Sequence, residues 1–426
     1  MQHQHGTSGF PYFTPRHWLS LVSLTSLCLA LACGDDDGPA SGTGGSGGGG
    51  AGGGGNGGNA GNNMPGGSGG VGGGAGGSSG EGNMAGAGGN GMGTGPSGTI
   101  QVLSGDAAVL LAPTTAAIRA TNVFVAIGQL GELPAFGGNN TPAPFTVISL
   151  PVAGGALGAT VALPGADFYP EGIAAAADGR LFVGSINTGA IVRVPANSTT
   201  AEAFVAAGAV AERGVVGLTV DEDRDLLWFC DTSPNAPGGA LVGVDLDLGT
   251  ETVRHDLPNP EPIVDADAGS DGGVEVADAG DAGAPAPRAT FCNDVRLNSD
   301  NDLLVTDSFG GRIFRIPSAD ALDDNSAEVW LTAPEIAPLA PDGFGVNGLA
   351  FAGDTLIVSS NGLFAINPES PATNIQAISL TLNGAPATLC GPDGVVAVPG
   401  TTNQVIVVEN GFCGGAARVI KVTLDL

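Results

Sequence analysis

Positive charge is scarce in this chain. Lys and Arg number only 13 among 426 residues, against 42 Asp and Glu, and the formal net charge is −29. A surface this acidic repels the phosphates of nucleic acids, so the sequence argues against a nucleic-acid partner. Histidine is also rare, and after residue 17 only His255 remains. In the part expected to fold, no His is placed to partner a Ser or Cys nucleophile, and no G-x-S-x-G nucleophile elbow occurs.

Aromatic residues make up only 5% of the chain, and its apolar content is carried by Ala, Val, Leu and Ile. This composition is typical of many short buried strands. Glycine is abundant instead, with 75 residues, and much of it precedes residue 98. A glycine-rich stretch cannot supply a core. We therefore expect a single folded domain at residues 99–426, although the length alone would allow two or three domains.

A long hydrophobic run is missing as well. The apolar stretch Trp18–Ala32 has 15 residues, too few to span a membrane but typical of the central region of a signal peptide. Small residues directly precede Cys33, as at a bacterial lipoprotein cleavage site. We predict a signal peptide at residues 1–32 and lipidation of Cys33, which would anchor an exported protein in the cell envelope, the outer membrane being favoured. The alternative is an ordinary secretory signal followed by a chance Cys.

Two segments have low-complexity composition. Residues 33–98 are mostly Gly with Ser, Asn and Ala, which predicts a flexible linker with a reach of about 40–45 Å. Residues 258–288 are acidic and rich in Ala, Gly and Pro, which predicts a disordered insertion within the folded domain. The aspartates of this insertion do not have the spacing of a twelve-residue calcium loop with its closing Glu.

A strand–turn–strand pattern recurs along the folded part. Its clearest copy is Phe291–Ile316, in which three short apolar strands are separated by polar turns. Other copies begin at Pro170-Glu171-Gly172, Val216-Gly217-Leu218, Asn347-Gly348-Leu349 and Pro392-Asp393-Gly394. A unit of about four strands that repeats every ~40–50 residues is typical of a β-propeller blade.

The least regular blade is expected at residues 99–160. Its strands are predicted at Thr99–Leu103, Ala108–Leu111, Val123–Ile127 and Phe145–Leu150. Together with the five units above it gives an all-β fold, a six-bladed β-propeller over residues 99–426, preceded by the signal peptide and the Gly-rich linker.

Cysteine is limited to six residues, of which Cys28 lies in the predicted signal peptide and Cys33 at the anchor. The remaining four are Cys230, Cys292, Cys390 and Cys413. An exported chain meets an oxidising compartment, so we expect disulfides, and four cysteines allow three pairings. Their positions in the blades favour 390–413 and 230–292. A zinc site is the alternative, but the sequence has no C-x-x-C pair.

Polar residues stand at one structural position in four of the predicted blades. Residues at the start of the innermost strands of a propeller converge at the mouth of its central channel. Here these residues are Glu171, Asn293, Asn347 and Asp393, whereas the third blade has Gly217 or its neighbour. Two carboxylates and two amides offer the oxygen ligands that hard cations prefer. The alternative is that each of these residues simply forms the turn that enters its strand.

The phased E-G, N-D, N-G-L and P-D-G motifs over residues 171–426 resemble the senescence-marker-protein/gluconolactonase-like (regucalcin-like) family. The resemblance implies one divalent cation in the channel of a six-bladed propeller. It implies as ligands Glu171, Asn293, Asn347 and Asp393. It also implies that Asp393 is the general base for lactone hydrolysis and that Asp294 lies on the substrate side of the metal. Two features depart from the family: Phe291 replaces a basic residue, and a bridge at Cys292 or Cys390 would crowd the channel mouth.

These patterns predict a monomeric, exported, metal-binding propeller that hydrolyses small lactones or esters bound in its channel. Calcium is the favoured cation, with zinc or manganese as alternatives, and the membrane is contacted through the N-terminal lipid. The alternative function is a non-catalytic propeller that binds a ligand or a protein at the cell envelope, because many propellers with similar NHL-like blades only bind.

Overall fold

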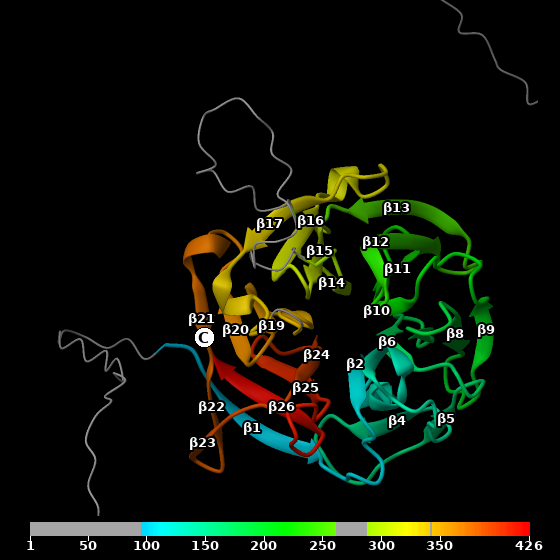
Figure 1. Ribbon diagram of the computed structural model, residues 1–426. Helices are drawn as coiled ribbons and strands as arrows, with labels where there is room; N and C mark the ends of the chain where they lie inside the picture. The colour runs from blue at the N-terminus through cyan, green and yellow to red at the C-terminus, as the bar shows by residue number, and fades with distance from the viewer. Residues whose placement is uncertain (1–94, 261–287, 341–342) are drawn as a thin grey trace, which may run out of the picture. The chain divides into compact units, whose positions relative to one another are not determined.

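The computed structural model describes residues 95–260, 288–340 and 343–426, all within one compact unit, Gly86–Leu426. These residues form six β-sheets arranged as blades around a central channel, which confirms the predicted all-β six-bladed propeller (Figure 1). The predicted signal peptide, Cys33 and most of the predicted linker lie outside the described residues, as do residues 261–287 of the predicted insertion. No helix in the described ranges is long and apolar enough to cross a membrane.

The first three blades are regular four-stranded sheets whose strands follow chain order from the channel outward. The first contains β2 (Pro113–Arg119), β3 (Asn122–Ile127), β4 (Thr146–Pro151) and β5 (Thr160–Ala162). The second contains β6 (Pro170–Ala175), β7 (Leu181–Ser185), β8 (Ile191–Val194) and β9 (Glu202–Val205). The third contains β10 (Val215–Asp221), β11 (Leu226–Ser233), β12 (Ala236–Asp245) and β13 (Glu251–Leu257).

The fourth and fifth blades are built in the same way. They contain β14 (Cys292–Leu297), β15 (Leu303–Asp307), β16 (Arg312–Ile316) and β17 (Glu328–Thr332), then β18 (Leu349–Ala352), β19 (Thr355–Ser359), β20 (Leu363–Ile366) and β21 (Ile375–Ala377). The described loops carry five 3-10 helices: η1 (Leu130–Glu132), η2 (Pro134–Phe136), η3 (Ser318–Asp320), η4 (Pro334–Ile336) and η5 (Pro371–Thr373).

The sixth blade closes the ring with strands from both ends of the domain. It contains β24 (Pro392–Ala397), β25 (Gln404–Glu409), β26 (Arg418–Asp425), β1 (Ser97–Ser104), β22 (Ser379–Leu382) and β23 (Ala385–Ala387). β1 pairs antiparallel with β26 and parallel with β22. The assignment of Thr99–Leu103 to the first blade was therefore wrong, and Ala108–Leu111 forms a turn rather than a strand. The sequence pattern correctly predicted that Thr99–Leu103 is a strand. The blade to which it belongs is determined by its pairing with β22 and β26, which lie far along the chain.

The core lies between the blades. The middle strands β7 and β15 are buried at every position, because each blade packs a neighbour against both of its faces. This explains why the apolar runs Leu181-Phe182-Val183 and Leu303-Leu304-Val305 are continuous rather than alternating.

Two disulfides lie close to the channel. Cys230 of β11 is bonded to Cys292 of β14, so this bridge joins the third blade to the fourth. Cys390 is bonded to Cys413, and this bridge ties the segment before β24 to the loop after β25. Both pairings are those favoured by the sequence. The Cys230–Cys292 bridge closes a loop of 62 residues, a length for which chain entropy gives a stabilisation of about 4 kcal/mol.

The ends of the predicted insertion belong to the folded domain, which corrects the boundaries 258–288. The carbonyl of Pro258 accepts hydrogen bonds from Thr290 Oγ1 at 2.8 Å and from Arg312 Nη2 at 3.0 Å. Arg288 Nη1 donates to the carbonyl of Gly343 at 2.9 Å.

Ring closure by β1 gives the first prediction. A chain that starts at Gly95 should keep the full melting temperature of the propeller. A chain that starts at Gly105 should melt about 6–24 °C lower or aggregate, because it loses the burial of Ile100 and Leu103 and exposes the edge of β26. Those two side chains account for roughly 3–6 kcal/mol, and each kcal/mol shifts the midpoint by about 2–4 °C. Calorimetry on both chains measures the difference, and equal midpoints would contradict closure by β1.

Candidate functional site

A β-bulge recurs where the innermost strand of a blade reaches the channel. In five blades two residues of that strand stand opposite one residue of the second strand, and the register shifts at equivalent places. A bulge of this kind bends the strand and re-aims its side chains. The first residues of the bulges are Thr114, Glu171, Val216, Asn293 and Asp393. Asn347 holds the equivalent place before β18, where its backbone N–H donates to the Ser359 carbonyl at 2.8 Å.

Four of these side chains meet in one cavity of about 420 Å³. They are the residues predicted as a group from the sequence: Glu171, Asn293, Asn347 and Asp393. The cavity is also lined by Asn410, which the sequence analysis missed. Asn410 directly follows Glu409 at the end of β25, and its place in the turn E-N-G was the only signal that could have indicated it.

The entry into these innermost strands is held by buried carboxylates at the ends of the second strands. Asp231 accepts hydrogen bonds from the backbone N–H of Arg213 at 2.8 Å, and Asp307 from that of Phe291 at 2.9 Å. Glu409 accepts one from Cys390 at 2.7 Å. Each of the three carboxylates also forms an ion pair, with Arg254, Arg312 and Arg418, respectively.

The second residue of the bulge, or its equivalent Gly348 in the fifth blade, is glycine in four blades, and the backbone of a neighbouring blade lies close to it. A Cβ atom at Gly172 would collide with the carbonyl of Val216, and one at Gly348 would lie 2.5 Å from the carbonyl of Asp393. At these glycines the backbones of neighbouring blades are in close contact, because no side chain lies between them. This contact fixes the distances between the side chains at the first bulge positions.

Thr115 and Asp294 are the two exceptions at this second position. Asp294 Oδ1 accepts from Val295 N at 2.9 Å and from Arg296 Nη1 at 2.8 Å, and Asp294 Oδ2 from Leu349 N at 3.3 Å. The carboxylate thus serves contacts within the protein, and Asp294 does not line the cavity. Burial raises the pKa of Asp294, whereas the charge of Arg296 opposes that rise. The substrate-side position that the resemblance implies for Asp294 stays a prediction.

Arg296 bridges three blades beneath the cavity. Besides its ion pair with Asp294, Nη1 donates to the carbonyl of Leu218 at 3.1 Å and Nη2 to that of Val395 at 3.5 Å. These carbonyls belong to β10, in the blade next to β14, and to β24, in the blade two places further around the ring. The guanidinium therefore neutralises the buried Asp294 and joins the third, fourth and sixth blades at the level of the channel.

Hydroxyl groups orient the Asn293 amide and hold the backbone of Asn347. Asn293 Nδ2 donates to Ser308 Oγ at 2.9 Å, and Ser308 Oγ donates to the carbonyl of Val346 at 2.6 Å. Thr306 Oγ1 holds the carbonyl of Asn347 at 2.7 Å. Because the Asn293 nitrogen is engaged in this way, its amide oxygen is the atom left for the cavity.

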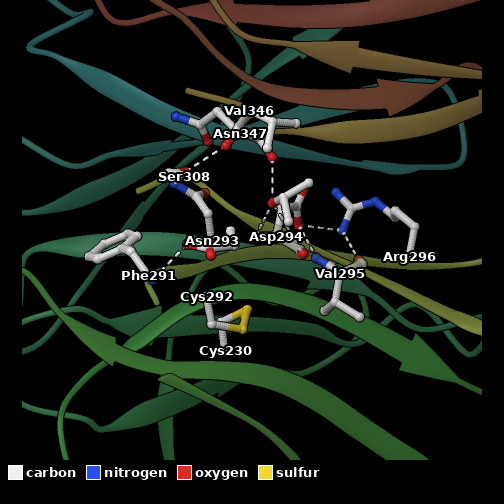
Figure 2. Close-up of a disulfide and its surroundings, with 12 residues drawn as sticks. Cys230, Phe291, Cys292, Asn293, Asp294, Val295, Arg296, Ser308, Val346 and Asn347 are labelled. Atoms are coloured by element: carbon white, nitrogen blue, oxygen red, sulfur yellow. Dashed lines mark hydrogen bonds and ion pairs between the residues drawn. A yellow bond between two sulfur atoms is a disulfide. The ribbon is translucent and has the colours of Figure 1, made fainter. Parts of the chain in front are cut away.

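The Cys230–Cys292 bridge does not crowd the site, contrary to the concern raised by the sequence. Figure 2 shows it on the opposite side of the β14 backbone from Asn293. Successive residues of a strand point to opposite faces, so Cys292 turns between the blades and is fully buried there while Asn293 turns to the cavity.

The two carboxyl groups of the cavity are buried without a compensating cation. Glu171 has neither an ion pair nor a hydrogen bond to its side chain among the described residues, and its pKa is raised well above 4.5 by burial first and then by Asp393 and Asp294. Burial likewise raises the pKa of Asp393, to about 7. Hydrogen bonds from Asn410 and Asn347 oppose this rise, whereas the negative charge of Asp294 adds to it. Asn410 Nδ2 donates to Asp393 Oδ2 at 3.2 Å.

The donor set is suited to a hard cation rather than to a thiophilic one. Within the described ranges, no three His, Cys, Asp or Glu side chains cluster as metal ligands would. The cavity offers two carboxylates and two amide oxygens instead, a mixed set that calcium accepts in proteins. An approaching cation would lower the pKa values of Glu171 and Asp393 and remove the cost of their ionisation. The residues present therefore fit a divalent cation.

Comparisons with known proteins agree with the propeller. Residues 158–194 match the family model described as strictosidine synthase-like, N-terminal, which covers β6 to β8 and includes Glu171. The fold is similar to that of a luciferin-regenerating enzyme, at 12% identity and a TM-score of 0.50 over 77% of this chain and 95% of that chain. No curated protein sequence matches the chain significantly.

Two further structures are similar at lower TM-scores. Virginiamycin B lyase from Staphylococcus aureus matches at 13% identity and a TM-score of 0.44, over 78% of this chain and 99% of that chain. A putative gluconolactonase matches at 11% identity and a TM-score of 0.48, over 77% and 92%. The gluconolactonase-like resemblance read from the phased motifs fits these findings, and at such identities the similarity concerns the fold alone.

The two uncompensated carboxyls give a pH prediction for chelated protein. Their folded pKa values lie above the unfolded ones, so the folded state binds more protons and stability falls as pH rises from about 4.5 through about 7. Glu171→Gln removes one of these groups. Its melting temperature should differ least from that of the wild type at pH 5 and exceed it most at pH 8, because only the wild type must then ionise a buried carboxyl.

Other titrating groups change the melting temperatures of the variant and the wild type equally, so the difference between the two temperatures isolates Glu171. One such group is His255, whose pKa is lowered by burial. A constant difference between the two proteins from pH 5 to pH 8 would show that Glu171 is not a strained carboxyl in the folded state.

Proposed function

We propose that this propeller is a divalent-metal-dependent hydrolase of small lactones or esters. One observation carries the proposal: Glu171 and Asp393 are buried together in a cavity with two amides, and neither carboxylate forms an ion pair with a described residue. A fold does not retain such a cost for stability alone. Perturbed carboxyls in a cleft are instead typical of a catalytic or metal site.

Glu171, Asn293, Asn347 and Asp393 would hold the cation through oxygen atoms. Calcium suits this set best, with manganese or zinc as alternatives, although zinc usually takes nitrogen or sulfur ligands. When bound, a divalent cation would polarise the carbonyl of the ester. Asn293 is well suited to a ligand role because its nitrogen already donates to Ser308, which directs the amide oxygen into the cavity.

Asp393 is the residue suited to move the proton. Its Oδ2 accepts from Asn410, which orients the carboxylate, and a cation beside it would keep it ionised and able to accept a proton. Asp393 would take a proton from water while the water oxygen bonds to the carbonyl carbon. The carbon–oxygen bond of the ester then breaks, and the leaving oxygen takes up the proton. A lactone would yield a hydroxy acid.

The comparisons support a catalytic role only in general terms. The structure similar at a TM-score of 0.50 is named as a luciferin-regenerating enzyme, so a propeller of this kind does serve an enzyme. The substrate of that protein is not transferred to this chain.

Asp393→Asn tests the proposed base. The variant keeps the size and one oxygen ligand but loses the charge, so the affinity for calcium should fall moderately while lactone hydrolysis falls ~10²–10⁴-fold. Calorimetric calcium titration and turnover of a lactone panel measure the two effects. Asp300→Asn, an exposed aspartate in the β14–β15 turn, is the matched control and should change neither. Turnover that survives chelation, or none across the panel with any cation, would favour the binding-propeller alternative.

We also propose that the protein is exported and held at the cell envelope by lipid on Cys33. The Gly-rich composition after Cys33 suits a tether between an anchor and a folded domain. Cys33→Ser should move the protein from the detergent-extracted membrane fraction to the soluble exported fraction. Cys28→Ser, within the predicted signal peptide, should leave partitioning unchanged. If the wild type is already soluble and exported, and Cys33→Ser partitions in the same way, the ordinary-secretion alternative stands; a Cys33→Ser protein that stays in the membrane fraction would exclude lipid on Cys33 as its anchor.

A further inference from the structure

The upper wall of the cavity is formed by phenylalanines. Phe136 comes from η2, Phe291 from the segment before β14, Phe344 from the β17–β18 loop and Phe412 from the β25–β26 loop. We call these four residues the phenylalanine collar. The polar groups of the cavity belong to the bulges and to the turn after β25, so the collar and the carboxylates form separate layers.

The collar is held in place from behind. The Phe291, Phe309 and Phe344 rings form a triangle with centroid distances of 4.8, 5.0 and 5.4 Å. Arg288 stacks on Phe309 at 3.1 Å from the ring centroid and holds the Gly343 carbonyl. Phe344 nevertheless remains 40% exposed. Its support therefore keeps an apolar ring open at the cavity instead of burying it in the core.

Phe412 is linked to the proposed base, Asp393, through hydrogen bonds of Asn410. It is 53% exposed and precedes Cys413, whose disulfide with Cys390 ties this loop to the entry of β24. The Phe412 N–H donates to Asn410 Oδ1 at 3.0 Å, while Asn410 Nδ2 donates to Asp393. One side chain thus fixes both the carboxylate and the exposed ring beside it.

The remaining chemistry of the cavity disfavours charged and highly hydroxylated molecules. None of the described residues that line it is Lys or Arg, so the lining offers no cationic side chain to an anionic substrate. The collar offers no hydrogen-bond partner to the hydroxyls of a sugar, and a hydroxyl buried without a partner costs free energy.

We infer that the substrate is a neutral, apolar lactone or ester with an alkyl or aryl substituent that lies against the phenylalanine collar. This inference rests on the proposed hydrolase function. The carbonyl would face the layer of Glu171 and Asp393, and the substituent would extend between Phe344 and Phe412. A polyhydroxylated or anionic lactone is correspondingly a poor substrate.

The first experiment measures kcat/KM with γ-butyrolactone, γ-octalactone, γ-decalactone and glucono-1,5-lactone in the presence of calcium. We expect kcat/KM to rise about fourfold for each added methylene until the collar is covered, as the burial of a methylene predicts. Glucono-1,5-lactone should be the poorest substrate. Faster turnover of glucono-1,5-lactone than of γ-decalactone would overturn the inference and leave the hydrolase proposal intact.

Binding without turnover separates failure of the inference from failure of the hydrolase proposal. The non-hydrolysable lactams 2-pyrrolidinone and 5-hexyl-2-pyrrolidinone are titrated into wild-type protein by calorimetry. We expect measurable binding only for the hexyl compound, with a negative heat-capacity change from apolar burial. Binding of the hexyl lactam without any lactone turnover would refute the hydrolase proposal alone. Equal or absent binding of both lactams would refute the apolar site.

Variants of an exposed collar residue complete the test. Phe412→Ala should lower the ratio of γ-decalactone to γ-butyrolactone kcat/KM at least tenfold, and Phe412→Leu should restore most of that ratio. Leu248→Ala is the matched control, because Leu248 is 71% exposed in the turn after β12 and does not line the cavity. A ratio that is unchanged in Phe412→Ala, with wild-type melting temperature, would show that the collar does not select the substrate.

Discussion

The channel mouth depends on a buried ion pair that recurs at the ends of second strands. Asp231, Asp307 and Glu409 each accept a backbone N–H from the segment that enters the innermost strand of the same blade, and each is paired with an arginine. Removing such an arginine would leave a buried charge uncompensated, which typically costs 3–5 kcal/mol. The pairs therefore fix where each strand begins. The bulge that follows then determines which side chain faces the cavity.

Much of this architecture could be predicted from the sequence because its chemistry is periodic. The recurring turns with glycine and aspartate predicted the six blades. One set of polar residues occupies the same position in four repeats, which predicted that their side chains lie close together: Glu171, Asn293, Asn347 and Asp393. Periodicity could not assign β1, because its partners β22 and β26 lie far along the chain. It also could not separate the two residues of a bulge. Asn293 faces the cavity while its neighbour Asp294 binds Arg296 below it, and only the three-dimensional register distinguishes them.

The apolar half of the site left no periodic signal at all. The collar residues come from four loops of different lengths, and no repeat places Phe136, Phe344 and Phe412 in phase. Loops carry the residues that differ between proteins of one fold, whereas the strands carry those that maintain it. This division explains how the polar residues at the strand entries can be combined with an apolar wall that the repeat does not specify. The departure at Phe291, where the gluconolactonase-like family carries a basic residue, is part of the same wall.

The contrast between two acidic layers of one channel identifies the functional one. In the lower layer Asp294 is neutralised by Arg296 and receives two backbone hydrogen bonds, so this fold can compensate a buried carboxylate. In the upper layer Glu171 has no such partner among the described residues, and Asp393 has only amides. A second arginine in the upper layer would stabilise the empty protein but would occupy the place of a cation and repel it. The missing compensation is therefore best explained as the condition for binding a cation.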